Sequence, residues 1–380
     1  MTQAFAFATS TEILFGRGKL AEAPGRIAAL GRRVLLVGGA TPARAAPLAA
    51  ALAAAGCTVT HFAVPREPDV PLIEAGVALA RASDAEAVMA LGGGAVIDAG
   101  KAIAAMVPAP RQMLDHLEVV GLGLPLDVAP LPFIAIPTTA GTGAEVTRNA
   151  VIGVPDHARK VSLRDARMLP RLALVDPALT DGCPRAITLA SGLDAITQVI
   201  EPFTSTRANP LTDALCADAI PRGLAALKRL MQSEDAQARD EMAWVSLCGG
   251  LALANAGLGA VHGLAGPLGG LTGAAHGAIC GALLPHVLRA NRRAVADPAR
   301  LDRVAGWLSE AFESAPDMDS AAQALSAWSQ SAGLPGLAAQ GIGPEVRAAA
   351  AQAAATSSSM KANPAPLSAA DLVAVQDAAA

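Results

Sequence analysis

The chain has 380 residues, a formal net charge of −4 and no tyrosine. Its length favours two domains, and its scattered basic residues and few aromatic side chains argue against a nucleic-acid partner. The five cysteines are dispersed and form no CxxC pair, which favours a reducing, cytoplasmic location over a disulfide framework. The absence of tyrosine excludes the Tyr-Lys mechanism of short-chain dehydrogenases, and the absence of GxSxG excludes the simplest serine hydrolase.

Residues 1–178 alternate β-branched runs with alanine-rich segments of helical pattern. This alternation is typical of a parallel sheet covered by helices on both faces. We therefore predict a doubly wound, mostly parallel α/β domain over residues 1–178. Strands are expected in "RRVLLVGGA", "TVTHFAV", "AEAVMALGGG", "PFIAIPTT" and "RLALVDP", and helices in "PARAAPLAAALAAAG", "PLIEAGVALARAS" and "AVIDAGKAIAAM".

After Pro177 helical patterns follow one another without a convincing strand, which predicts an all-α domain over residues 179–380. Its last helix is expected in "LSAADLVAVQDAA", behind a serine cap. Residues 244–288 contain no Asp, Glu, Lys or Arg and could form two membrane crossings. Their many glycines, three histidines and missing aromatic belts favour a buried helical core instead, so no membrane partner is expected. The N-terminus does not resemble a signal peptide.

Two glycine-containing loops follow predicted strands. In "LGGGAVIDAGKAIA", Gly92, Gly93 and Gly94 precede a helix, so backbone N–H groups could bind a pyrophosphate. A plain βα turn is the alternative, and a nucleotide-triphosphate P-loop fits poorly because Ala102 replaces its Ser or Thr. "IPTTAGTGAEVT" offers hydroxyls at Thr138, Thr139 and Thr142, suited to a ribose or adenine edge or to a capped turn. In a doubly wound sheet such loops meet where ligands bind.

The segment "SGLDAITQVIEPF" places Asp194 and Gln198 four residues apart in mostly apolar surroundings. On a helix both side chains share one face, which suits either a capping or core hydrogen-bond pair or a metal site.

Five segments in order, "GGGAVIDAGKAIA", "PTTAGTGAEVT", "KVSLRDARMLPRLALVDPALT", "SGLDAITQVIEPF" and "HGAICGALLPHVLRAN", resemble the iron-containing (group III) alcohol dehydrogenases. The resemblance covers nearly the whole chain. It implies a dehydroquinate synthase-like fold with its active site in the cleft between the two domains. It also implies NAD(P)-dependent interconversion of a small-molecule alcohol and an aldehyde or ketone, by a homodimer or larger homo-oligomer.

The resemblance also assigns the cofactor site. NAD-preferring members have an Asp after the first strand, where this chain has Gly38 and Gly39, so NADP is plausible as well as NAD and Arg44 could pair with its 2′-phosphate. The other residues implied to bind the cofactor are Gly92, Gly93, Gly94, Ala95 and Asp98 at the pyrophosphate and nicotinamide ribose, Thr138, Thr139 and Thr142 at the adenine side, and Lys160 at a ribose hydroxyl.

Similar family members bind iron or zinc through an Asp, a His four residues later and two further His. Asp194, His262 and His276 match, and are the expected catalytic centre, but Gln198 replaces the second ligand. Carboxamide oxygen is a poorer donor than imidazole, so we expect a weakly bound divalent metal, held by Asp194, Gln198, His262 and His276, rather than a metal-free cleft. Gly266 replaces another family histidine and should leave room for a bulkier substrate. Taken singly, His262 and His276 could also be core histidines.

Three alternatives stay open. The first is a metal-free reductase of the same fold, resembling maleylacetate reductases. The second is an NAD-using lyase like dehydroquinate synthase, although no basic cluster for a phosphorylated sugar acid is evident. The third is a non-catalytic nucleotide-binding protein. Separately, the apolar "FAFA" near the N-terminus could form a strand that pairs across a subunit interface.

Overall fold

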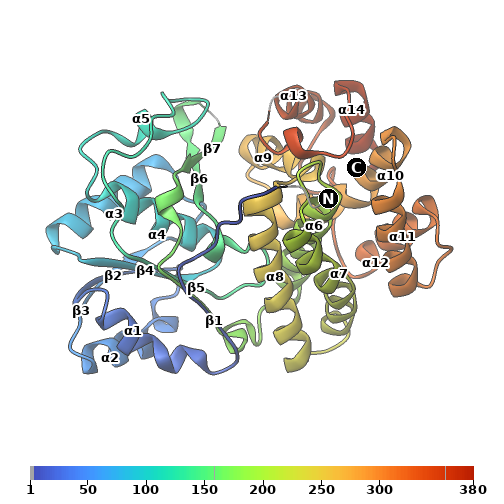
Figure 1. Cartoon of the computed structure of the whole chain (residues 1–380). Helices are drawn as coiled ribbons and strands as arrows, with labels where there is room; N and C mark the ends of the chain where they lie inside the picture. Colours follow the sequence, from blue (N-terminus) through green and yellow to red (C-terminus); the bar gives the residue numbers. More distant parts are fainter. Residues whose placement is uncertain (1–3, 158, 356) are drawn as a thin grey trace. The chain divides into compact units, whose positions relative to one another are not determined.

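A computed structural model of the chain describes residues 4–157, 159–355 and 357–380 (Figure 1). The chain divides into two compact units. The α/β unit comprises Thr9–Thr139 and Gly143–Thr180, and the helical unit comprises residues 4–8, Ala140–Thr142 and Asp181–Ala380. The functional domain limits expected from the sequence, 1–178 and 179–380, stay a prediction.

The α/β unit is built on a six-stranded sheet whose neighbouring strands are all parallel. All five strands expected from the sequence are present in it. The strand order is β1 (Ile13–Phe15), β8 (Leu172–Val175), β5 (Phe133–Pro137), β4 (Ala87–Gly92), β2 (Arg33–Gly38) and β3 (Thr58–Ala63). The unit's helices are α1 (Ala23–Ala28), α2 (Ala46–Ala54), α3 (Val70–Ala82), α4 (Gly94–Met106) and α5 (Met113–His116).

Helices cover both faces of this sheet, with α1 and α2 on one side and α3 and α4 on the other (Figure 1). Successive residues of β2 show why: Leu35 and Val37 are buried in one apolar cluster with Ile97 of α4, while Val34 and Leu36 are buried in another. Because side chains alternate across a strand, a strand buried on both faces must be apolar throughout. The predicted doubly wound α/β fold is confirmed.

Two parts of the α/β unit were not expected. Strand β1 has three residues, and β6 (Asn149–Val154) pairs with β7 (Arg159–Arg164) in a separate antiparallel sheet. Strand β7 buries only its alternate residues Val161 and Leu163. Such a half-exposed strand with basic ends lacks the continuous apolar run by which the other strands were recognised.

The pairing of "FAFA" across a subunit interface stays a prediction, because it involves a second chain. Residues 4–8 form no strand. Instead, the Ala8 N–H donates to Asn255 Oδ1 at 2.6 Å, and Asn255 Nδ2 donates back to the Ala8 carbonyl at 2.8 Å. The side-chain amide of Asn255 therefore satisfies both backbone polar groups of Ala8.

The helical unit contains no strand among its described residues, as the sequence predicts. Helix α6 lies at its centre and packs against α7, α8 and α10. The last helix begins behind a capping box of Ser368 and Asp371, as expected from its serine. The helices are α6 (Arg185–Thr204), α7 (Pro210–Leu230), α8 (Ala236–Ala256), α9 (Ala260–Thr272), α10 (His276–Ala294), α11 (Ala299–Phe312), α12 (Met318–Ser331), α13 (Pro344–Ala354) and α14 (Ala369–Ala378).

The uncharged segment 244–288 lies in α8, α9 and α10, and its apolar side chains belong to the buried core of the helical unit. Within the described residues, no single helix has the length and apolar character needed to cross a membrane. Helices α8 and α9 meet those requirements only as a pair, and they are bent by 100° at the break between them.

Candidate metal centre

Helix α6 carries three polar side chains on one face. Gln198 and Glu201 follow Asp194 by four and seven residues, so the three side chains lie above one another on successive turns. All three are buried, and Asp194 is only 2% exposed. Buried carboxylates are costly unless paired or bound to a cation, so their partners decide what this face of α6 does.

The first turn of α9 brings His262 to α6. The Val261 N–H donates to Glu201 Oε1 at 2.7 Å, and the Ala260 N–H donates to Asn363 Oδ1 at 3.0 Å. A Cβ added at Gly259 would lie within 2.9 Å of both acceptor atoms, so glycine permits this contact. Side chains far apart in sequence thus satisfy the free N–H groups that begin the helix.

Glu201 also orients the His262 ring. His262 Nδ1 lies 2.6 Å from Glu201 Oε2 and donates to it, which leaves Nε2 to face Asp194 Oδ1 at 3.3 Å. Carboxylate support of this kind is typical of metal-binding histidines. Asp194 Oδ1 and His262 Nε2 are both buried without a hydrogen-bond partner. A proton or a cation between them would remove that deficit.

Helix α10 contributes two more donors. His276 is its first residue and Cys280 lies one turn later, on the same face. His276 Nε2 is 3.7 Å from Asp194 Oδ1 and 3.6 Å from Cys280 Sγ. A Cβ added at Gly277 would lie 2.4 Å from the Ala190 carbonyl oxygen. Glycine at 277 therefore allows α10 to approach α6 closely enough for these donors to converge.

Ligand atoms of Asp194, His262, His276 and Cys280 all lie within 4.8 Å of one another. We call this set the metal cluster. Its oxygen, nitrogen and sulfur donors are those that bind zinc or iron. Asp194 Oδ1 and His262 Nε2 are buried without a hydrogen-bond partner, so the residues fit a shared cation.

The cluster is electrostatically coupled. Cys280 and Asp194 raise the pKa of His276 to about 9, against burial and the charge of His262. Burial opposes protonation of His262, but Cys280, Glu201 and Asp194 raise its pKa well above the usual value. Burial favours the neutral form of Asp194, yet the two histidines and Cys280 hold its pKa below normal. Protons therefore compete with a metal for these atoms.

Gln198 makes a different contact. Its Nε2 donates to the Gly141 carbonyl oxygen at 2.7 Å, and a Cβ at Gly141 would lie 3.0 Å from Ser191 Cβ. Gln198 thus holds segment Ala140–Thr142, including Thr142, against α6. Its expected role as a ligand stays a prediction. At Gly266 an added Cβ would meet nothing within 4 Å, which agrees with the expected open space.

Sequence reasoning did not single out Cys280 or Glu201. A signal existed for each, because Cys280 lies four residues after His276 and Glu201 lies seven after Asp194. Both spacings place the side chain on the face of the helix that carries the recognised ligand.

The expected pyrophosphate-binding glycines lie between β4 and α4. A Cβ at Gly93 would lie 3.3 Å from Thr139 Oγ1, and the Thr138 N–H donates to the Gly92 carbonyl at 3.0 Å, so the loops after β4 and β5 are neighbours. Helix α4 begins at Gly94, followed by Ala95, and no side chain caps its N-terminus. Such a helix end favours an anion.

Other expected cofactor residues have structural partners. Asp98 Oδ2 accepts the Val151 N–H at 3.0 Å, and Lys160 Nζ lies 3.7 Å from Glu67. Gly38 ends β2, with Gly39 next, and Arg44 is exposed shortly after them. The roles expected for these residues in cofactor binding stay predictions.

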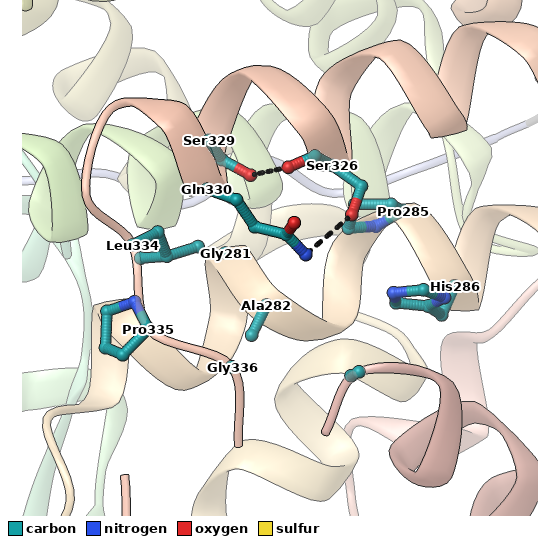
Figure 2. Close-up of a pocket in the computed structure, with 11 residues that line it drawn as sticks. Gly281, Ala282, Pro285, His286, Ser326, Ser329, Gln330, Leu334, Pro335 and Gly336 are labelled. Carbon is teal, nitrogen blue, oxygen red and sulfur yellow. Dashed lines mark hydrogen bonds between the residues drawn. The ribbon is translucent and has the colours of Figure 1, made fainter. Parts of the chain in front are cut away.

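Figure 2 shows a pocket elsewhere in the helical unit, lined by residues of α10, α12, the segment after α12, and Ala379. On its α12 side, Gln330 Nε2 donates to Ser326 Oγ at 3.4 Å. Its cavity volume of about 10 Å³ is enough for about one water molecule. No residue of the metal cluster lines it.

Comparison with known proteins identifies two family models that together match most of the chain. The family described as "Iron-containing alcohol dehydrogenase" matches residues 10–177, and "Fe-containing alcohol dehydrogenase family, C-terminal" matches residues 188–380. The probable alcohol dehydrogenase EutG of Salmonella typhimurium is 38% identical over 65% of this chain, and the match spans 62% of that relative's length. The 1,3-propanediol dehydrogenase of Klebsiella pneumoniae is 34% identical over 72% of this chain and 70% of its own.

Solved structures agree with the sequence matches. A crystal structure of a 1,3-propanediol oxidoreductase is 29% identical, superimposes with a TM-score of 0.91 and covers 100% of both chains. The resemblance carried by the five sequence segments is thus confirmed: the chain belongs to the iron-containing alcohol dehydrogenase family.

Proposed function

We propose that the protein is an NAD(P)-dependent oxidoreductase that interconverts a small-molecule alcohol and an aldehyde or ketone, with a divalent metal at Asp194, His262 and His276. The observation that carries this proposal is the pair of buried atoms, Asp194 Oδ1 and His262 Nε2, that face each other without a hydrogen-bond partner. The names of the relatives, an alcohol dehydrogenase and a propanediol dehydrogenase, supply the reaction class.

A divalent iron or zinc ion bound there would act as a Lewis acid toward the substrate oxygen. Asp194 supplies a negative charge to the ion, and Glu201 fixes the His262 ring through Nδ1. The His276 side chain is 38% exposed, whereas those of Asp194 and His262 are nearly covered. Substrate therefore approaches past His276, and the open space at Gly266 leaves room for a substituent.

The cofactor is proposed to bind at the turns after β4 and β5. The uncapped N-terminus of α4 attracts the pyrophosphate through its N–H groups and helix dipole. Thr138, Thr139 and Thr142 would offer hydroxyls to the adenine side, and Asp98 and Lys160 would hold the riboses. A nicotinamide bound there would supply the hydride chemistry. Gly38 and Gly39 leave no carboxylate to repel a 2′-phosphate, so NADP is proposed as well as NAD. A homodimer or larger assembly and a cytoplasmic location also stay predictions.

The proposal is tested by elemental analysis of the purified protein, together with an NADH and NADPH oxidation screen against aldehydes, ketones and keto acids. Bound iron or zinc and turnover that falls on chelation are the expected results. Turnover that persists after complete metal removal would favour the metal-free reductase. Tight NAD binding without net oxidation would contradict the proposed reaction.

A further inference from the structure

We propose that Cys280 is the fourth protein ligand of the metal and that its thiolate makes the site select zinc. The inference rests on the proposed metal role of Asp194, His262 and His276. In this proposal, the Cys280 sulfur on α10 takes the role of the family's second histidine ligand, at whose position on α6 this chain has Gln198.

The separations of the donor atoms support a tetrahedral site. Ligands at about 2.0 to 2.3 Å from a tetrahedral zinc ion are about 3.3 to 3.8 Å from one another. Asp194 Oδ1 lies 3.3 Å from His262 Nε2 and 3.7 Å from His276 Nε2. Cys280 Sγ lies 3.6 Å from His276 Nε2. All three distances are edges of such a tetrahedron, and all four donors lie within 4.8 Å of one another.

The position of Cys280 is set by close helix packing. It lies between Gly277 and Gly281 on α10. A Cβ at Gly281 would lie 2.7 Å from Leu193 Cδ1, and one at Gly277 would lie 2.4 Å from the Ala190 carbonyl oxygen. These two contacts hold α10 against the part of α6 that carries Asp194. Side chains at either glycine would push the Cys280 sulfur away from the cluster.

Cys280 can also supply a negative charge to the ligand set, which Gln198 cannot. Gln198 already uses its amide N–H on the Gly141 carbonyl, and a carboxamide brings no charge. A Cys280 thiolate and the Asp194 carboxylate together balance a divalent ion within the ligand set, which lowers the cost of burying it. Thiolate is a soft ligand that favours zinc over the harder divalent ions.

Cys248 shows how an ordinary core cysteine differs. Both cysteines are fully buried in the core of the helical unit, but burial raises the pKa of the Cys248 thiol to about 12. Cys280 instead has an imidazole nitrogen within 3.6 Å. Cys248 is therefore a matched control for substitution.

The experiment compares the metal-free full-length protein with its Cys280→Ser, Cys248→Ser and Gln198→Ala variants. Each is titrated with Co²⁺ while the near-ultraviolet charge-transfer band from thiolate to cobalt is followed, and zinc affinity is measured by competition with a chelator. Circular dichroism checks that each variant is folded. Loss of a supporting residue around a metal typically weakens binding 10- to 100-fold, so loss of a direct ligand should weaken zinc binding by more than about 100-fold.

We expect the band in the wild type, Cys248→Ser and Gln198→Ala, and its absence in Cys280→Ser together with the loss of zinc affinity. A folded Cys280→Ser protein that keeps the wild-type spectrum and affinity would overturn the inference. So would a wild type that binds cobalt without the band, although the proposed function would survive that result. A wild type that binds neither cobalt nor zinc would overturn both. The preference of the site for zinc over iron is measured by competition between Zn²⁺ and Fe²⁺ under anaerobic conditions. Preferential binding of iron would refute the zinc assignment.

Discussion

The α/β unit and the helical unit each bury ionisable side chains, and the two clusters differ in how their polar atoms are satisfied. In the α/β unit, Lys101 Nζ donates to the Ala144 carbonyl at 2.8 Å, to Thr147 Oγ1 at 2.9 Å and to the Asn149 carbonyl at 2.8 Å. An ammonium group has three donors, and all three are used. In the metal cluster, two buried polar atoms lack a hydrogen-bond partner.

This difference separates a structural charge from a ligand site. The Lys101 ammonium ties α4 to the segment that leads into β6, and its geometry is complete without another molecule. The metal cluster is complete only when a cation or protons are added. Burial alone therefore does not identify a functional site, whereas unsatisfied and convergent donors do.

The largest expected effect comes from removing the Lys101 ammonium and its three hydrogen bonds. Lys101→Met leaves two carbonyls and a hydroxyl without their donor and leaves the buried Glu145 without a nearby positive charge. Removing one member of such a group typically costs about 3 to 5 kcal/mol. Urea denaturation should show this loss of unfolding free energy. A loss below about 1 kcal/mol would contradict the structural role assigned to Lys101.

The second prediction concerns pH. Burial raises the pKa of Glu145 from 4.5 to about 7, with Lys101 opposing the rise. The folded protein then holds a proton that the unfolded chain releases, so the contribution of Glu145 to stability is complete below pH 4.5 and is lost as pH rises to 7. We expect a loss of about 3 kcal/mol over this range, because each pKa unit corresponds to about 1.4 kcal/mol.

Glu145→Gln is the control for that measurement, because its amide does not titrate. Chemical denaturation at a series of pH values should give a flatter profile for the variant than for the wild type between pH 4.5 and 7. Identical slopes in this range would show that Glu145 does not carry the effect.

Next to the metal cluster, Glu201→Gln tests the carboxylate that orients His262. The amide oxygen can still accept one N–H, but the negative charge behind His262 is lost. Supporting carboxylates of this kind contribute about 10- to 100-fold to metal affinity. Zinc competition should reveal that loss while the fold is retained. Unchanged affinity would mean that Glu201 only caps α9.

The smallest effect is expected at the cofactor site. Arg44 is exposed near Gly38 and Gly39, so Arg44→Ala should weaken NADPH binding about fivefold, the scale of one exposed ion pair. NADH binding should not change. Fluorescence titration measures the dissociation constants of NADPH and NADH for the wild type and the variant. Equal weakening of both cofactors would contradict pairing of Arg44 with the 2′-phosphate.

The fold was predictable because its signals are local. Continuous apolar runs such as "RVLLV" and "AVMAL" mark strands buried on both faces, and the helical periodicity after Pro177 marks the second unit. The short β1 and the half-exposed hairpin β6–β7 were missed because their patterns are brief and partly polar.

The site was only partly predictable because it depends on contacts between helices. Asp194, His262 and His276 were recognised from family motifs, and the structure brings their donor atoms together. The involvement of Cys280 depends on the distance between α6 and α10, which Gly277 sets by its contact with Ala190. The involvement of Glu201 depends on how closely the first turn of α9 approaches α6. Neither helix-to-helix distance can be read from residue spacing along one helix.

The most direct test of the metal cluster is the metal content of the purified protein after loading with zinc and removal of excess ion, compared between the wild type and two histidine variants. We predict about one zinc ion per chain in the wild type and in His286→Ala, whose histidine lies on α10 outside the cluster, and almost none in a folded His262→Ala. A wild type without bound metal, or a His262→Ala variant that retains it fully, would contradict the account.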